Sequence, residues 1–244
     1  MKRSASSSLS WWERFRFYWG AFIISFVVAA MMIPAIMLFP KKKGIIMHKL
    51  NGLILKLIGA KVETSGALDP DADMIIMNHQ GIIDIIGMEA LQTHHLRWAA
   101  KKELFDATWF GNLLKHGEMI SLDRGNKAAL VSLLKSVKES RTKLGRPVGI
   151  FPEGTRAKDQ TLLPFKAGTK IVAEKLGLKV QPVVITGSKW VLNEHNKTAH
   201  NGVVHYTFLP TIDVSTADDE WFEKMREEMQ KVIDTEEKHH HRSR

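Results

Sequence analysis

The chain has 244 residues, a formal net charge of +9 and no cysteine. Its length suits one good-sized domain plus an extra segment. The lack of cysteine excludes disulfides, thiolate metal sites and a cysteine nucleophile.

The positive charge is concentrated near the N-terminus. Residues 1–60 contain nine lysines and arginines and a single acidic residue, Glu13, whereas the remaining chain has 26 basic and 25 acidic residues. The basicity therefore belongs to one segment and is not the signature of a nucleic-acid-binding domain. We expect no nucleic-acid partner and treat residues 1–59 as a separate, membrane-associated helical segment.

The longest uncharged run, residues 17–40, is long enough to cross a membrane. Trp11, Trp12, Tyr18 and Trp19 lie near one end, where amphipathic rings favour the lipid headgroup zone. A cleaved signal peptide is disfavoured because the apolar part is too long and no small-x-small cleavage site follows it.

Both ends of this run are basic, which is unusual for a single span. Lys2, Arg3, Arg14 and Arg16 precede it, residues 41–43 are three lysines, and Pro34 offers a bend inside it. We therefore predict an anchor that dips into one leaflet of the inner (plasma) membrane, with both flanks on the cytoplasmic face in contact with membrane phospholipids.

Residues 45–58 form a second apolar helix that is too short to cross a bilayer. This helix either lies in the membrane interface or packs on the protein core, and the sequence leaves both open.

From residue 60 to residue 235 apolar strands alternate with helices. The predicted strands are Lys61–Ser65, Met74–Met77, Leu96–Ala100, Met119–Leu122, Val148–Phe151, Val180–Ile185 and Val203–Phe208. The predicted helices are Gly81–Leu91, Trp109–Lys115, Asn126–Lys143, Ala167–Leu176 and Asp219–Asp234. This order predicts an α/β domain with a mixed, largely parallel sheet and helices on both faces. Residues 236–244, which include three consecutive histidines, are predicted to be a frayed, solvated tail.

The first chemical motif is His79 followed by Asp84, placed where the strand Met74–Met77 gives way to a helix. With His79 in the loop and Asp84 in the first helical turn, the carboxylate can reach back to one imidazole nitrogen and leave the other free as a base. Backbone N–H groups at the helix start after Gln80 are candidates to stabilise an oxyanion. The competing interpretation is a histidine that caps the helix, with Asp84 favoured by the positive helix N-terminus.

Three other predicted strands end in charged turns, where open α/β sheets place ligand-binding loops. Lys101 follows the first, Arg124 the second, and Phe151-Pro152-Glu153-Gly154-Thr155-Arg156 the third. Arginine and lysine side chains gathered at strand ends predict an anion site suited to a phosphate. The alternative is that Arg124 and Arg156 simply pair with Asp123 and Glu153 on the surface.

The order of these motifs resembles the glycerolipid acyltransferase family, in particular 1-acyl-sn-glycerol-3-phosphate acyltransferases. The likeness covers roughly residues 45–212 and rests on four ordered segments and one that follows the third. These are Asn-His-x4-Asp at 78–84, Gly-x6-Arg at 117–124, Phe-Pro-Glu-Gly-Thr-Arg at 151–156, Val-Gln-Pro-Val-Val at 180–184, and Leu-Pro-Phe-Lys-Ala-Gly at 163–168.

The resemblance implies transfer of an acyl group from acyl-CoA or acyl-carrier protein to the sn-2 hydroxyl of lysophosphatidic acid, with no cofactor and no metal. It implies that His79 and Asp84 are catalytic. It also implies substrate-binding roles for Lys101, Arg124, Glu153, Gly154, Thr155 and Arg156.

Three alternatives remain open. The acceptor could be glycerol 3-phosphate or another lysolipid, and the chain could be a catalytically inactive lipid-binding protein of the membrane. A metal hydrolase using His79, Asp84, His94 and His95 is disfavoured because the spacing matches no common metal motif.

Overall fold

The computed structural model describes residues 11–92, 95–107, 110–123 and 128–242. A twisted sheet of eight strands forms its centre, in the order β1-β9-β6-β2-β5-β3-β4, with β10 paired to β6. A small hairpin, β7–β8, stands apart from it. The strands are β1 (Ala60–Ser65), β2 (Met74–Met77), β3 (Arg97–Lys101), β4 (Ile120–Leu122), β5 (Val148–Ile150), β6 (Lys179–Thr186), β7 (Leu192–Asn193), β8 (Thr198–Ala199), β9 (Gly202–Phe208) and β10 (Ile212–Asp213).

Strands β6, β2, β5, β3 and β4 run parallel to one another, whereas β9 and β10 run antiparallel to β6. The carboxyl ends of the parallel strands therefore meet at one edge of the sheet, the usual place for a ligand site in such folds. The predicted mixed, largely parallel sheet is confirmed.

Alternate residues of the central strands face opposite layers. On β2, Ile75 and Met77 belong to one hydrophobic cluster with the N-terminal helices, while Met74 and Ile76 belong to a second cluster with C-terminal helices. All four side chains are fully buried. A strand covered on both faces has no polar side, which explains its uninterrupted apolar sequence.

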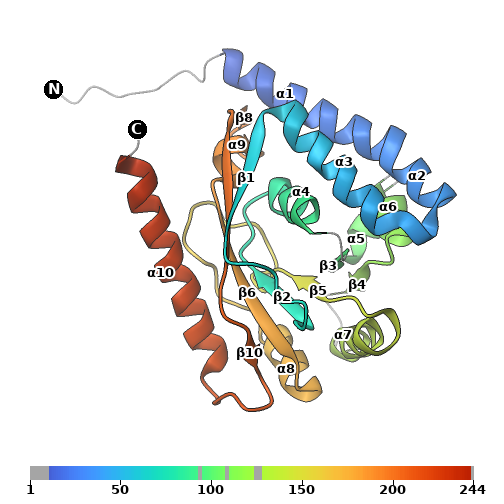
Figure 1. Ribbon diagram of the computed structural model, residues 1–244, viewed down its shortest axis with the longest axis vertical. Helices are drawn as coiled ribbons and strands as arrows, with labels where there is room; N and C mark the ends of the chain where they lie inside the picture. The colour runs from blue at the N-terminus through green and yellow to red at the C-terminus, as the bar shows by residue number, and fades with distance from the viewer. Residues whose placement is uncertain (1–10, 93–94, 108–109, 124–127, 243–244) are drawn as a thin grey trace.

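Helices cover both faces of the sheet, as predicted (Figure 1). The helices α1, α3 and α4 lie on one side, and α8 and α10 on the other. The α-helices are α1 (Trp11–Phe26), α2 (Ile33–Leu38), α3 (Lys43–Ile58), α4 (Ile82–Leu91), α5 (Lys102–Phe105), α6 (Phe110–His116), α7 (Ala128–Glu139), α8 (Ala167–Leu176), α9 (Ser188–Val191) and α10 (Trp221–Arg242).

The N-terminal apolar run is one continuous helix, Trp11–Leu38, long and apolar enough by composition to cross a membrane. Its middle, Val27–Met32, has π-helical hydrogen bonding, and Ile33 N–H donates to Val28 O across that stretch. Pro34, the predicted bend, lies in the first turn of α2, directly after the π-helical stretch. Proline lacks an N–H, and the change of hydrogen-bond pattern occurs just before it.

One face of this helix packs on the α/β domain through Ile23, Val27 and Ile36. Helix α3 returns beside it and buries Met47 and Ile54 against α4 and the core. The segment 45–58 therefore packs on the core, although Ile45 and Leu57 on its other face remain exposed.

The C-terminal prediction is wrong in one respect. Helix α10 was expected to end at Asp234 and instead continues to Arg242, so residues 236–242 are helical rather than a frayed tail. The stripe formed by Trp221, Met225 and Met229 is buried against β6 and its neighbours, which supports the helix from one side. Helix α7 also ends early, at Glu139, and a π-helical turn, Ser140–Leu144, completes the predicted segment.

Candidate active site

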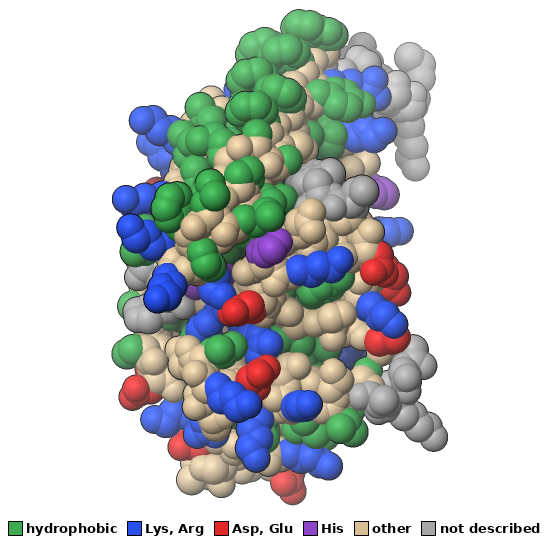
Figure 2. Space-filling view, turned by 90° about the vertical axis from the view of Figure 1, so that its right-hand side faces the viewer, with side chains coloured by type: hydrophobic (Ala, Val, Ile, Leu, Met, Phe, Trp, Pro, Cys, Tyr) green, Lys and Arg blue, Asp and Glu red, His purple; other side chains and the backbone are tan. Residues whose placement is uncertain are grey.

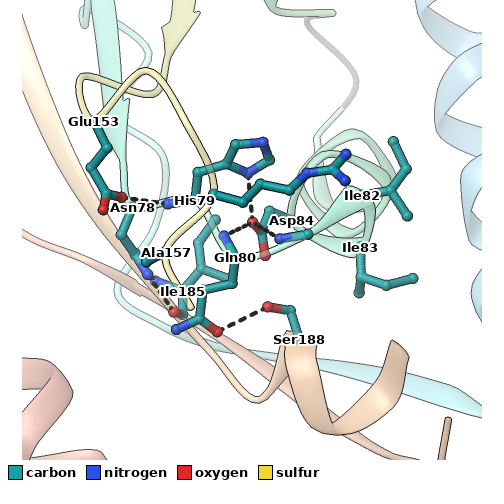
Figure 3. Close-up of polar contacts among 12 residues, drawn as sticks. Asn78, His79, Gln80, Ile82, Ile83, Asp84, Glu153, Ala157, Ile185 and Ser188 are labelled. Atoms are coloured by element: carbon teal, nitrogen blue, oxygen red, sulfur yellow. Dashed lines mark hydrogen bonds and ion pairs between the residues drawn. The ribbon is translucent and has the colours of Figure 1, made fainter. Parts of the chain in front are cut away.

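His79 lies in the loop between β2 and α4, and Asp84 lies in the first turn of α4, as predicted (Figure 3). The His79 Nδ1 atom is 2.9 Å from Asp84 Oδ2. Asp84 is fully buried, and the imidazole side chain is 14% exposed. A carboxylate at Nδ1 favours the tautomer with the proton on that nitrogen, which leaves Nε2 free to accept a proton.

The Asp84 carboxylate also caps the helix that carries it. Its Oδ2 atom accepts hydrogen bonds from Gln80 N–H at 2.6 Å and from Gly81 N–H at 2.9 Å. The next N–H, that of Ile82, donates to Glu194 Oε1 at 3.0 Å. These N–H groups are therefore bonded to carboxylates in the structure, and a role for the groups after Gln80 in stabilising an oxyanion stays a prediction.

Tyr206 on β9 hydrogen-bonds to the first turn of α4. Its hydroxyl donates to Asp84 O at 2.8 Å and lies 3.2 Å from Ile83 O. A Cβ atom on Gly87 would lie 2.1 Å from that hydroxyl, so glycine is needed for this close approach. Burial raises the pKa of Tyr206 well above its ordinary value, with the Asp84 charge as a second cause, and keeps the hydroxyl protonated as a donor.

Glu153 holds the third motif against His79 by binding two backbone amides. Its Oε1 accepts from His79 N–H and its Oε2 from Leu163 N–H, both at 2.8 Å. In return, Ala157 N–H donates to His79 O at 2.9 Å, and the Lys189 ammonium donates to Ala157 O. Burial raises the pKa of Glu153, and the two N–H groups oppose that rise. Glu153 was predicted to bind substrate. In the structure its buried carboxylate binds the backbone N–H groups of His79 and Leu163.

A stack of three rings lies on the other side of the imidazole. The His79 and Phe151 ring centroids are 3.9 Å apart, and those of Phe151 and Trp98 are 5.4 Å apart. The Trp98 indole N–H donates to Glu89 Oε1 at 2.7 Å, where Glu89 is a buried residue of α4. The stack fixes the plane of the imidazole from one face while Asp84 fixes it from Nδ1.

A cavity of about 1360 Å³ extends from His79 into the apolar layer between the sheet and the N-terminal helices. Its wall includes Val28 and Met32 of the N-terminal helix and Ile86 of α4. Among the predicted binding residues, those that share this wall with His79 are Lys101, Gly154, Thr155 and Arg156. Gly154 has φ +73°, a backbone conformation that favours glycine in the turn presenting Thr155 and Arg156.

The predicted arginine site is described only in part, because Arg124 lies outside the described residues. Arg156 does not pair with Glu153. It forms an ion pair with Glu194, from the turn after β7. Asp123, the other predicted surface partner, pairs with Lys102 at 3.1 Å.

The metal-hydrolase alternative named His79, Asp84, His94 and His95. His95 Nδ1 lies 3.5 Å from Glu89, and His94 is outside the described residues. Within the described ranges, no group of three or more histidines and acidic residues is placed to hold a metal ion.

Five residues of the site were not identified from the sequence: Glu89, Trp98, Lys189, Glu194 and Tyr206. Three of them reach the site from segments more than 25 residues beyond the motif they contact, and only the three-dimensional fold brings them near. Glu89 alone carries a local signal, as an acidic residue within the apolar helix after Asp84.

Comparison with known proteins gives a consistent result. A family model described as "Acyltransferase" matches residues 61–186. The 1-acyl-sn-glycerol-3-phosphate acyltransferase of Helicobacter pylori is 40% identical over 176 residues, which cover 72% of this chain and 74% of that protein. The enzyme of the same name from Escherichia coli is 30% identical and covers 67% of each chain.

A solved structure shares the fold. The crystal structure of the 1-acyl-sn-glycerophosphate (LPA) acyltransferase PlsC from Thermotoga maritima matches with a TM-score of 0.75 and 19% sequence identity. The match covers 92% of this chain and 96% of that one.

Proposed function

The chain belongs to the acyltransferase family, and from this premise we propose that it acylates the sn-2 hydroxyl of lysophosphatidic acid to give phosphatidic acid, a step of phospholipid biosynthesis. The observation that carries the proposal is the His79–Asp84 pair beside a large apolar cavity. The relatives are named for this reaction. The donor is an acyl thioester, either acyl-CoA or acyl-carrier protein.

In the proposed reaction, His79 Nε2 accepts the proton of the acceptor hydroxyl as that oxygen attacks the thioester carbonyl carbon. The C–S bond of the resulting tetrahedral intermediate breaks, and the leaving thiolate takes the proton from the imidazolium. The products are the ester and a free thiol. Because a thioester is already activated, no covalent acyl-enzyme is needed.

The environment of His79 supports this role. The ring stack and Asp84 hold the imidazole in one orientation, which reduces the cost of reaching a reactive geometry. Asp84 also stabilises the imidazolium that forms when Nε2 takes the proton.

The apolar cavity suits the acyl chain, and the cationic groups on its wall suit the phosphate. Arg156 presents a planar guanidinium that can bind two phosphate oxygens, while Lys101 adds a second positive charge. Arg124 remains a proposed member of this site from its place in the sequence.

The N-terminal helices supply the proposed membrane contact. An exposed apolar face carries Trp11, Phe15, Tyr18, Phe22 and Phe26, each at least 46% exposed. Figure 2 shows hydrophobic side chains gathered over this part of the molecule, with lysine and arginine at its borders. We propose that this face enters one leaflet on the cytoplasmic side of the membrane, with the α/β domain of residues 60–235 below it.

The test is an assay of the purified protein in phospholipid vesicles with a radiolabelled acyl donor and a panel of acceptors. The panel contains lysophosphatidic acid, glycerol 3-phosphate, lysophosphatidylcholine and monoacylglycerol. We expect product only, or predominantly, from lysophosphatidic acid. Equal use of all acceptors, or none, contradicts the proposal.

Arg156→Lys tests the phosphate site separately. The variant keeps the charge and loses the planar fork, so we expect weaker use of lysophosphatidic acid. If the variant discriminates between acceptors with and without a phosphate as the wild type does, Arg156 does not bind the phosphate.

A further inference from the structure

Glu194 brings a carboxylate from outside the four motifs into contact with two of them. It lies in the turn between β7 and β8, and its two carboxylate oxygens have different partners. Oε1 accepts from Ile82 N–H at 3.0 Å, and Oε2 pairs with the Arg156 guanidinium. These partners are 112 and 38 residues away along the chain.

Arg156 is the cation to which we assigned the acceptor phosphate, and it lines the same cavity as His79. In the structure its guanidinium is paired with an internal anion, the Glu194 carboxylate. We propose that Glu194 sets the affinity for the acceptor as a built-in competitor, which the phosphate of the acceptor must displace from Arg156. This inference rests on the proposed function.

The exposure of the pair permits such an exchange. The Arg156 side chain is 46% exposed and that of Glu194 is 27% exposed. Exposed ion pairs contribute little net stability because water competes for both partners. An incoming anion can therefore replace the carboxylate without unfolding the loop, which hydrogen bonds from Glu153 and Lys189 hold independently.

The exchange favours one chemical class of acceptor. A phosphomonoester carries a charge of about −1.5 to −2 near neutral pH and three terminal oxygens, so it competes well against a single carboxylate. A phosphodiester headgroup carries only one negative charge, and a neutral headgroup carries none. Arg156 therefore favours lysophosphatidic acid in this exchange, and Glu194 raises the concentration at which every acceptor that needs Arg156 binds.

The test is Glu194→Gln, which removes the charge and keeps an oxygen for Ile82 N–H. We expect the KM for lysophosphatidic acid to fall by roughly threefold or more, because removing a competing state raises the fraction of competent sites. The change in KM should exceed any change in kcat. The preference for lysophosphatidic acid over lysophosphatidylglycerol, measured as the ratio of kcat/KM values, should stay nearly constant, because the competition lowers the affinity of both acceptors by the same factor.

Two further variants make the result specific. Glu228→Gln, on the exposed surface of α10, removes the same charge far from the cavity and should change neither KM nor preference. In an Arg156→Ala background, Glu194→Gln should have no effect on KM, because the competition requires Arg156. The inhibition constant of glycerol 3-phosphate against each variant gives a second measure of anion binding.

An unchanged or raised KM in Glu194→Gln overturns the inference, and a raised KM identifies Glu194 as a residue that positions Arg156. An effect that persists without Arg156 also overturns it. Failure of the wild type to acylate lysophosphatidic acid contradicts the proposed function itself, which is a separate result.

Discussion

His79 is restrained from several directions. Asp84 binds one ring nitrogen, Phe151 covers one ring face, and both backbone polar groups of His79 are hydrogen-bonded, to Glu153 and to Ala157. Each restraint comes from a different segment of the chain. The residue with the proposed chemical role therefore also connects the loops of the site, through its backbone as well as its side chain.

Replacing the base should separate activity from stability. We expect His79→Ala to lower kcat by about 10²–10⁴-fold and the melting temperature only modestly, because Asp84 keeps two backbone N–H donors. Asp84→Asn should lower both, because its carboxylate also caps Gln80 N–H and Gly81 N–H. Near-normal turnover of folded His79→Ala would show that His79 is not the base.

Glu153 provides a pH-dependent prediction. Burial raises its folded pKa, so the folded protein holds this proton more tightly than the unfolded chain. The contribution of Glu153 to the free energy of unfolding therefore falls as pH rises from the ordinary glutamate pKa through the raised value. Glu153→Gln lacks this titration, so the stability difference between wild type and variant should shrink across that window.

Thermal unfolding of both proteins at a series of pH values measures this difference. Glu153→Gln should also lower kcat, since its amide NH₂ would face the N–H of either His79 or Leu163. Glu63→Gln is the matched control, because Glu63 is exposed and pairs with His205 at 3.6 Å. Equal pH profiles for wild type and Glu153→Gln would refute the assignment.

Local sequence spacing predicted the His79–Asp84 contact, because a strand, a loop and a first helical turn place both residues within reach. It could not assign Glu153, since the partners of that carboxylate are 74 residues before it and 10 residues after it. An acidic residue next to a turn looks the same in sequence whether it faces substrate or supports a loop.

At the scale of elements, β3, β5 and α4 are joined by the ring stack and by the buried carboxylate at its end. Glu89 on α4 receives the indole N–H of Trp98 on β3, which stacks on Phe151 after β5. A buried carboxylate that loses a donor is costly, because no water replaces that donor.

We therefore expect Trp98→Phe to lower the free energy of unfolding by about 1–3 kcal/mol, although a ring remains in the stack. Trp190→Phe is the matched control, because its indole N–H donates to Asn201 O at 3.2 Å on an exposed surface. Denaturant unfolding measures both variants. If the two substitutions lowered the free energy of unfolding equally, the hydrogen bond to buried Glu89 would contribute no more than the exposed one.

The elements themselves were largely predictable, and the exceptions have a physical basis. The seven predicted strands and five predicted helices all occur, because apolar runs and helical periodicity are the primary local signals of secondary structure. The strands β7, β8 and β10 have two residues each, which is too short for a periodic signal. The extension of α10 beyond Asp234 runs through a polar sequence with no apolar stripe to reveal it.

For the whole molecule, the packing of the N-terminal helix on the α/β domain bears on how the protein contacts the membrane. The helix is long enough to span, yet Ile23, Val27, Met32 and Ile36 are buried against the rest of the protein. A helix that packs on the domain along this length cannot also be surrounded by lipid. This arrangement favours the one-leaflet anchor.

Cysteine labelling tests this topology in the cysteine-free chain. Single cysteines introduced at Ser6 and at Gly44 flank the apolar helix, and a third at the exposed Glu228 serves as a control in the α/β domain. We expect all three to be protected from an impermeant thiol reagent in spheroplasts and labelled after lysis. Labelling at Ser6 but not at Gly44 before lysis would establish a true span.

The cavity reaches from His79 to Val28 and Met32 of the helix proposed to enter the bilayer. We therefore expect a lipid acceptor to pass from the leaflet to the imidazole without entering bulk water. The relevant substrate concentration is the mole fraction of lysophosphatidic acid within the vesicle surface. Diluting that lipid with an inert phospholipid should slow the reaction, whereas diluting the vesicles in buffer, once the protein is bound, should leave the turnover rate of each bound molecule unchanged.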